Sequence, residues 1–303
     1  MKVLIVARLK NGHYAPFIEE QVDALRRLNV KFSFFPVRRK GLFGYLRHIA
    51  ELKKRIQTWE PDIIHAHYGF SGVLANLQRD IPVVTTYHGS DINKSKARFI
   101  SRWAIKESSY NIFVSKKTIE IANPKRRYAL IPCGINLEDY PITEKHQARD
   151  VMSLDQERKY VLFSGAFDNK VKNAPLAKEA MTLLPDAELL ELKGYNRVQV
   201  ATLMQAVDAI LMTSFTEGSP QVIKEALACG CPIVSVDVGD VSEMIEGVDG
   251  CFISEAMPEA LADNLRKAIC FNRRTAGRDV ILRKGLTNDL IARRIIAIYK
   301  TLS

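Results

Sequence analysis

Two glutamates eight positions apart are the residues of this sequence best suited to do chemistry. Glu217 lies in a polar loop that follows an apolar run, and Glu225 lies within the helix-like pattern that comes next. Carboxylates accept hydrogen bonds, so both suit a ligand rich in hydroxyl groups, such as a sugar or a ribose. Taken alone, two glutamates at this spacing also fit an ordinary solvated helix.

The residues between the two glutamates predict an anion site. Ser219 is a favoured N-cap residue and Pro220 a favoured first helical residue, so we expect a helix over 220–229 that Gly230 ends. A helix that begins at the carboxyl end of a strand offers its free amides and the positive end of its dipole to an anion. Gly218 would let a ligand approach the backbone closely. A phosphate bound here would have a glutamate on either side.

The elements that must position these residues follow from the hydrophobic pattern. Short, almost continuously apolar runs alternate with amphipathic stretches, which predicts parallel sheets whose strands are joined by helices. Strands are expected over 3–7, 31–35, 62–67, 83–87, 111–115, 128–132, 160–164, 187–192, 209–213, 232–236 and 251–253. Helices are expected over 16–28, 42–58, 97–107, 174–184, 197–206, 220–229, 241–246, 258–271 and 288–302.

The segment over 133–159 has no clear periodicity, and we interpret it as the linker between two domains. We therefore predict two Rossmann-like, doubly wound α/β domains, over 1–150 and 151–303. The last helix is a candidate to pack back on the first domain. Ligands bind such sheets at the carboxyl ends of the strands, so two domains that face each other would form one cleft.

Composition agrees with two globular domains, and the charge is one-sided. The chain has 303 residues, of which 47% are hydrophobic and 26% charged, which excludes a disordered or fibrous protein. Residues 1–150 carry 26 Lys and Arg against 14 Asp and Glu, whereas 151–303 carry 18 against 20. A basic excess confined to one half favours an anionic partner: a nucleic acid, a membrane surface or a phosphorylated substrate.

Several functional classes are disfavoured by motifs that the sequence lacks. It has no G-x-G-x-x-G after its first strand and no P-loop, which argues against dinucleotide oxidoreductases and P-loop phosphotransferases. The five cysteines are scattered and form no C-x-x-C pair, which favours a reducing cytosol. No apolar run approaches the roughly 20 residues of a membrane span, and the apolar start is typical of a buried strand. We expect a cytoplasmic protein.

The whole segment over 217–236 resembles the signature of the retaining, nucleotide-sugar-dependent glycosyltransferase family 4, approximately E-G-[FS]-P-x4-E-A-x-A-x-G-x-P-[VI]-V. Other landmarks follow in the family's order: P-D-I-I-H-A-H at 61–67, H-G-S-D at 88–91 and I-P-C-G-I-N at 131–136. This resemblance covers essentially the whole chain. It implies the GT-B fold of the glycogen synthase-like superfamily, with the acceptor bound mainly by the first half and the donor by the second.

The resemblance also implies roles for particular residues. Glu217 would contact the hydroxyls of the donor sugar, and Glu225 would hold the ribose hydroxyls. His88 would lie beside the transferred sugar, and Gly12 would let backbone amides approach the diphosphate. The amides of the segment between the two glutamates would meet the sugar and diphosphate; its implied binding residues are Gly218, Ser219, Pro220 and Val222.

The sequence departs from the family pattern after the first strand of the second half. The family commonly has G-R-x4-K-G there; here the resemblance implies that Gly165 contacts the donor, but Gly165 is followed by Ala166. Lys172 is our first choice for the lysine that binds the diphosphate, and Lys170 is the second. Electrostatic stabilisation of the departing diphosphate should dominate catalysis, and Lys172 with the helix N-terminus can supply it. No D-x-D motif is present, so we expect no metal requirement.

Together these observations predict a retaining, metal-independent hexosyltransferase without a cofactor. Its donor would be a UDP- or GDP-sugar, and its acceptor a lipid-linked or growing surface glycan. A basic, amphipathic stretch over 38–58 makes the first half a candidate for peripheral contact with the inner face of the plasma membrane. A non-catalytic GT-B binding or scaffold subunit is the alternative, because of Ala166. Nucleic-acid binding is disfavoured, since no nucleic-acid-binding motif accompanies the charge.

Overall fold

A computed structural model describes residues 1–10, 12–38, 47–125 and 127–302. The chain forms two compact units, each with its own parallel sheet. Unit 1 comprises Met1–Gly134 and the C-terminal segment from Leu286, and unit 2 comprises Ile135–Gly285. The units therefore divide after Gly134, whereas the sequence placed the boundary at residue 150, and the last helix belongs to unit 1.

Unit 1 has a six-stranded parallel sheet in the order β2-β1-β3-β4-β5-β6. Its strands are β1 (Lys2–Arg8), β2 (Lys31–Val37), β3 (Ile63–His67), β4 (Val83–Tyr87), β5 (Tyr110–Phe113) and β6 (Tyr128–Leu130). The strands at the centre of the sheet are buried on both faces, which explains their continuous apolar pattern. Every strand predicted from the sequence is present in the two units, with ends that differ by at most two residues.

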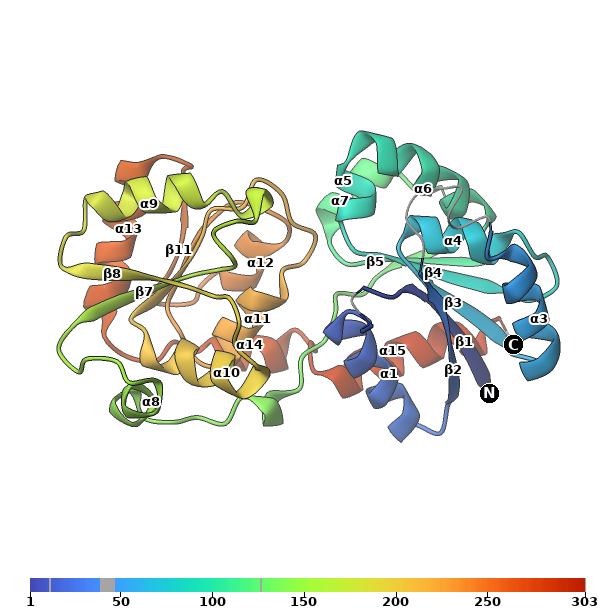
Figure 1. Cartoon of the computed structure of the whole chain (residues 1–303), viewed down its shortest axis with the longest axis horizontal. Coiled ribbons are helices and arrows are strands. Elements are labelled where there is room, and N and C mark those ends of the chain that lie inside the picture. Colours follow the sequence, from blue (N-terminus) through green and yellow to red (C-terminus); the bar gives the residue numbers. More distant parts are fainter. Residues whose placement is uncertain (11, 39–46, 126, 303) are drawn as a thin grey trace. The chain divides into compact units, whose positions relative to one another are not determined.

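Helices cover both faces of the unit 1 sheet (Figure 1). On one face lie α1 (Pro16–Arg27) and α15 (Asn288–Lys300), which pack against each other. On the other face lie α3 (Ile49–Trp59), α4 (Gly69–Asn76), α5 (Ser90–Asn93), α6 (Ser95–Glu107) and α7 (Lys116–Ala122). The predicted helix over 42–58 is thus described only from Ile49, because 39–46 lie outside the described residues.

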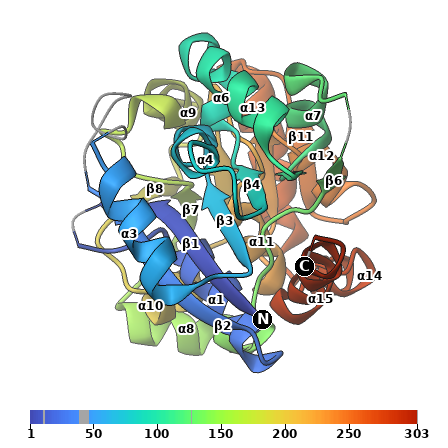
Figure 2. The same cartoon turned by 90° about the vertical axis from the view of Figure 1, so that its right-hand side faces the viewer.

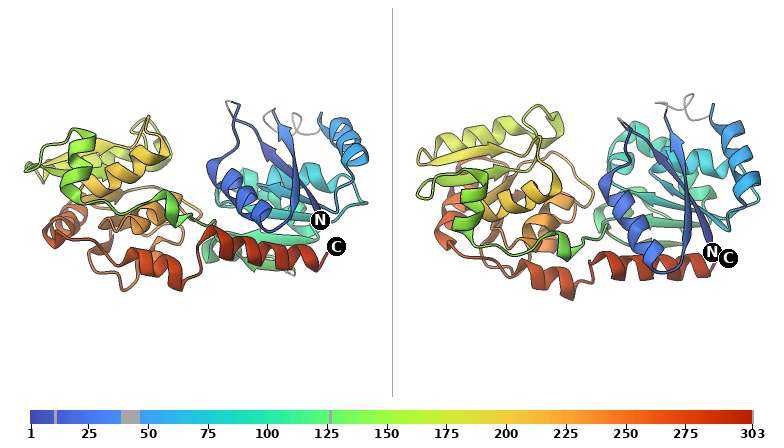
Figure 3. Two further views of the ribbon diagram at one scale, coloured as in Figure 1. Left: turned by 90° about the horizontal axis from the view of Figure 1, so that it is seen from below. Right: turned by 60° about the horizontal axis from the view of Figure 1, so that its bottom comes forward.

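The C-terminal helix is an integral part of unit 1. Views from the side and from below show α15 on the face opposite α3 and α4, with the N- and C-terminal ends close together (Figures 2 and 3). Arg27 of α1 pairs with Asp289 of α15 at 2.7 Å, and Tyr299 is fully buried against the sheet. The residues at the end of the sequence therefore complete the core of the first sheet.

Unit 2 has a five-stranded parallel sheet in the order β11-β10-β9-β7-β8. Its strands are β7 (Lys159–Phe163), β8 (Ala187–Glu191), β9 (Ala209–Met212), β10 (Ile233–Val236) and β11 (Cys251–Ser254). Helices α9 (Ala174–Thr182) and α13 (Pro258–Phe271) cover one face and share its apolar core. The other face carries α10 (Arg197–Ala206), α11 (Gln221–Ala228), α12 (Val241–Ile245) and α14 (Gly277–Arg283), as Figure 1 shows.

The interpretation of 133–159 as a linker is wrong. The segment contains a short 3-10 helix, η1 (Leu137–Asp139), and α8 (Lys145–Met152), which packs against α10 within unit 2. Arg149 of α8 is buried and donates hydrogen bonds to Asp208 Oδ2 at 2.9 Å and to the Ala206 carbonyl at 3.0 Å. An ion pair, not an apolar stripe, anchors this helix, so hydrophobic periodicity did not reveal it.

Candidate substrate-binding sites

In unit 2, the loop that carries Glu217 follows the buried strand β9 and is tied to a neighbouring turn. That turn is the 3-10 helix η2 (Lys170–Lys172). The Thr213 hydroxyl donates to the carbonyls of Lys172 and Asn173 at 2.9 Å each, and the Phe215 amide donates to the Val171 carbonyl at 2.9 Å. These bonds hold the Glu217 loop and η2 together at the carboxyl end of the sheet.

Three residues predicted for the donor site meet here. Lys172 Nζ lies 2.8 Å from Glu217 Oε1, and both side chains are mostly buried, at 17% and 19% exposed. A Cβ at Gly165 would lie 3.0 to 3.3 Å from Cγ, Cε and Cδ of Lys172, so glycine leaves room for the lysine stem. The second lysine, Lys170, is solvent-exposed. An ammonium held this way can pair with a phosphate in place of, or together with, the carboxylate.

The helix after this loop begins one residue later than predicted. Pro220 is the N-cap of α11, and Ser219 does not cap the helix. The Ser219 hydroxyl donates instead to Asp240 Oδ2 at 2.6 Å, because that buried carboxylate needs a donor. The end of the helix is as predicted, with Gly230 in the left-handed conformation at φ 65°.

The backbone around Gly218 packs closely against a second glycine, Gly239. A Cβ at Gly239 would lie 2.6 Å from the Gly218 carbonyl oxygen, and Gly239 has a φ of 59°. Val222 is buried in the first turn of α11, and Glu225 is partly exposed one turn further along. The first amides of α11 lie outside its own hydrogen-bond ladder, as at every helix start. The predicted anion site therefore lies at a helix start that follows a buried strand, and the binding of an anion there stays a prediction.

Sequence reasoning missed a buried cation behind this site. Lys224 is fully buried and donates to Gln221 Oε1 at 2.8 Å. Burial raises the pKa of Asp240, and the charge of Lys224 opposes that rise. One oxygen of Asp240, Oδ1, is buried without a hydrogen-bond partner. The signal that could have revealed this pair is a lysine on the apolar face of a helix, directly after Val222 and Ile223.

In unit 1, His88 follows β4 and joins a chain of polar contacts. Its Nε2 lies 3.0 Å from His67 Nδ1, and its Nδ1 lies 3.7 Å from Cys133 Sγ. The ring packs on Phe17 and Tyr68, each with centroids 4.6 Å apart. Burial lowers the pKa of His67 to about 3, so His67 is neutral at pH 7. The sequence analysis missed His67 and Cys133 as partners of His88.

A buried carboxylate fixes the loop after His88. Asp91 accepts hydrogen bonds from the amides of Gly69 at 2.9 Å and His88 at 3.1 Å. Burial raises the pKa of Asp91 to about 6, although these bonds favour the charged form. The neighbouring His65 is fully buried and contacts Tyr299 Oη at 2.5 Å and Thr86 Oγ1 at 2.7 Å.

Gly12 lies in a tight turn after β1. Lys10 and His13 exchange two backbone hydrogen bonds, of 2.9 and 3.1 Å, and Gly12 has a φ of 84°. That conformation strains any other residue, so glycine is required by the turn itself. Apart from its chain neighbours, no described residue has an atom within 4 Å of a Cβ at this position, so the space beside Gly12 is open.

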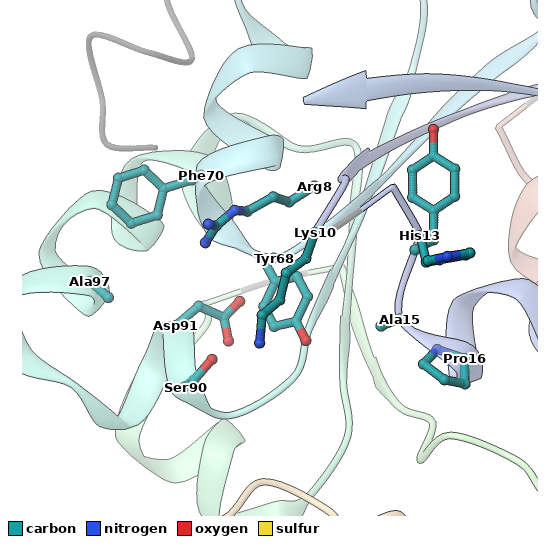
Figure 4. A pocket seen from close by; sticks show the side chains of 11 residues that line it. Arg8, Lys10, His13, Ala15, Pro16, Tyr68, Phe70, Ser90, Asp91 and Ala97 are labelled. Atoms are coloured by element: carbon teal, nitrogen blue, oxygen red, sulfur yellow. The ribbon is translucent and has the colours of Figure 1, made fainter. Parts of the chain in front are cut away.

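Beside this turn lies a pocket of about 550 Å³ within unit 1 (Figure 4). It is formed at the carboxyl ends of β1, β3 and β4, where ligands bind in such sheets. The side chains of Arg8 and Lys10 extend toward the side where Tyr68 and Asp91 lie (Figure 4). Its lining residues are Arg8, Lys10, His13, Tyr14, Ala15, Pro16, Tyr68, Phe70, Ser90, Asp91 and Ala97.

Two parallel α/β units of this topology define a protein of the GT-B fold. Solved structures share it across 99% of this chain. Sucrose-phosphate synthase from Thermosynechococcus elongatus matches with a TM-score of 0.85 at 15% identity over 98% of its own chain. Anabaena Alr3699/HepE in complex with UDP matches with a TM-score of 0.78 at 15% identity over 100% of its chain. At such identities these likenesses concern the fold alone.

Sequence comparison gives the family. Residues 3–139 match the model of Glycosyltransferase Family 4, and residues 186–270 match that of Glycosyl transferases group 1. The chain belongs to glycosyltransferase family 4. No helix in the described part of the chain is long and apolar enough to cross a membrane.

Relatives of known name are distant. The putative teichuronic acid biosynthesis glycosyltransferase TuaC of Bacillus subtilis is 28% identical over 68% of this chain and 61% of its own length. The uncharacterized glycosyltransferase MJ1178 of Methanocaldococcus jannaschii is 26% identical over 88% of this chain and 82% of its own. The D-inositol 3-phosphate glycosyltransferase of Mycobacterium marinum is 25% identical over 64% of this chain and 52% of its own length. The chain thus spans less than two thirds of two of these three relatives.

Proposed function

We propose that this protein transfers a hexose from a UDP- or GDP-sugar to a hydroxyl group of an acceptor, with retention at the anomeric carbon and without a metal. The observation that carries the proposal is the Lys172–Glu217 pair beside the start of α11, within the family signature. A mostly buried ammonium next to helix amides suits a diphosphate, and a carboxylate beside it suits sugar hydroxyls.

The chemistry requires one bond to break and one to form at the anomeric carbon. The bond from this carbon to the phosphate oxygen breaks, and its electron pair leaves with the diphosphate. The acceptor oxygen attacks from the same face, and its proton goes to the departing phosphate oxygen. Lys172 and the α11 amides stabilise the charge that develops on the leaving group. Glu217 and Glu225 bind hydroxyls of the sugar and the ribose, and His88 orients the donor sugar.

The enzyme is tested with a panel of UDP- and GDP-hexoses, by following slow release of the nucleoside diphosphate. We expect release from at least one donor, and at least a hundredfold less with Glu217→Gln. Glu179→Gln on α9 is the matched control, because Glu179 is exposed on a helix outside the site. Absence of both donor hydrolysis and nucleotide binding would exclude the proposal.

A second candidate function is favoured by Ala166, which stands where the family commonly has an arginine for the diphosphate. In this alternative the chain binds nucleotide sugars but does not turn them over. The same panel distinguishes the two functions, because a binding subunit gives saturable binding with no release of diphosphate. Changing Ala166→Arg would then raise donor affinity without creating turnover.

For the acceptor, we propose a lipid-linked or growing surface glycan and peripheral attachment to the cytoplasmic face of the membrane. Support comes from the basic excess of residues 1–150 and from the name of TuaC, a putative teichuronic acid biosynthesis glycosyltransferase. Sedimentation with anionic liposomes at low and high salt tests the attachment. Pelleting at low salt that salt reverses is expected, and no pelleting at low salt would contradict it.

A further inference from the structure

The pocket of unit 1 carries positive charge that its own residues do not neutralise. Within the described residues, the side chains of Arg8 and Lys10 form no ion pair. Arg8 Nε is buried and has no hydrogen-bond partner in the part of the chain that the structure describes. Burying a guanidinium nitrogen without an acceptor costs free energy. An anionic ligand in the pocket would supply the missing acceptor.

The acidic groups near the pocket offset only part of this charge. Asp91 is the one acidic residue among the lining residues, against Arg8 and Lys10, and its oxygens accept backbone hydrogen bonds from Gly69 and His88. Glu19 lies on α1 and is exposed. A further cation, Arg38, acts on the Tyr14 hydroxyl and opposes the rise in its pKa that burial causes. The pocket therefore keeps an excess of positive charge.

The aromatic residues that line the pocket are suited to packing against a ring of the ligand rather than to binding a second anion. Tyr68 and Phe70 both line the pocket; Figure 4 shows the Arg8 side chain extending toward Phe70 and the Tyr68 ring beside Lys10. Aromatic side chains with a few placed polar groups are typical of small-molecule sites. A volume of about 550 Å³ is enough for one or two sugar rings with a charged substituent.

We propose that this pocket binds the acceptor through a phosphate group that pairs with Arg8 and Lys10. The sugar or polyol ring that bears the phosphate lies against Tyr68 and Phe70. A phosphate monoester carries about −1.5 to −2 charges and can pair with both cations, and the planar guanidinium binds two of its oxygens at once. The inference rests on the proposed transfer function and names the class of its acceptor: a phosphorylated sugar or polyol, free or attached to a lipid.

Calorimetry with matched probes tests the proposal. Glucose 6-phosphate and myo-inositol 1-phosphate are compared with glucose and myo-inositol, and phosphatidylinositol in detergent micelles is compared with the empty micelles. The wild-type protein should bind at least one phosphate probe at least tenfold more tightly than its neutral counterpart. The soluble and the micellar probes distinguish a free sugar phosphate from a lipid phosphate.

Variants locate the preference for phosphate. Arg8→Gln should lose it at least tenfold, and Arg8→Lys should lose part of it, because an ammonium lacks the planar fork. Lys53→Gln is the control, since Lys53 is an exposed cation on α3 outside the pocket. Thermal melts check that each variant folds. If Arg8→Gln does not fold, Lys10→Gln provides the second test.

Two results would overturn the inference: no phosphate probe binds, or Arg8→Gln and Lys10→Gln both keep the full preference. Donor hydrolysis by the wild-type protein is measured separately, with no phosphate probe present. Failure of that hydrolysis counts against the proposed transfer function. Failure of phosphate binding alone counts only against the acceptor class.

Discussion

Replacement of Lys172 by methionine probes the step at which we expect most of the catalytic stabilisation. Its ammonium lies 2.8 Å from Glu217 Oε1 with the lysine side chain 17% exposed. At an effective dielectric constant of about 20, two unit charges at this distance attract by roughly 6 kcal/mol before desolvation is subtracted. Loss of one such group from a leaving-group site costs about 2.7–4 kcal/mol in the transition state. Lys172→Met should therefore lower kcat by about 10²–10³-fold.

The assay is release of nucleoside diphosphate at saturating donor, with Lys170→Met as the comparator. Because Lys170 is exposed on the same turn, its replacement should lower kcat less than about threefold. The double variant with Glu217→Gln should recover part of the stability lost in Lys172→Met, since no unpaired carboxylate remains. Equal losses in the two lysine variants, or a loss below threefold in Lys172→Met, would refute the assignment of Lys172.

Three further predictions concern the groups that hold the sites in place. Ser219→Ala should lower the free energy of unfolding by about 1–3 kcal/mol in urea titrations, because Asp240 loses its hydroxyl donor. Gly239→Ala should destabilise the fold and reduce donor turnover, since its Cβ would lie 2.6 Å from the Gly218 carbonyl. Asp91 has a folded pKa of about 6, above its ordinary 3.8, so the stability it contributes is full below about pH 4 and is lost as pH rises through 6. The unfolding free energy of the wild type, relative to Asp91→Asn, should fall by about 2–3 kcal/mol over this range, and a rise would contradict it.

The strands could be predicted from the sequence because burial on both faces leaves continuous apolar runs. Helices that pack through glycines or ion pairs, without an apolar stripe, could not be predicted. In α4, a Cβ at Gly72 would lie 2.8 Å from Thr85 Cγ2, and one at Gly69 would overlap the Ser101 side chain. Such glycines allow close packing in the fold, but in the sequence alone they indicate a loop. Helix α8 could not be predicted either, because the ion pair of Arg149 holds it in place and its sequence has no apolar stripe.

The candidate site of unit 2 was predictable as a motif, but its internal contacts were not. The residues that favour a helix start and end, Ser219, Pro220 and Gly230, located α11 within one residue at each end. That Lys172 rather than Lys170 meets Glu217 depends on a single turn of η2, which residue types alone do not determine. Ser219 shows the same limit: its type favours a helix cap, but its hydroxyl instead donates a hydrogen bond to Asp240, a buried acceptor distant in sequence.

The most direct test of the proposed transfer is the product formed from a donor panel by the wild-type protein and Glu217→Gln. Each UDP- and GDP-hexose is incubated with the protein, and the anomer first released or transferred is identified by NMR. We predict turnover of at least one donor, a product with the donor's anomeric configuration, and at least a hundredfold loss in Glu217→Gln. A product of inverted configuration, or full activity in the variant, would contradict the proposal.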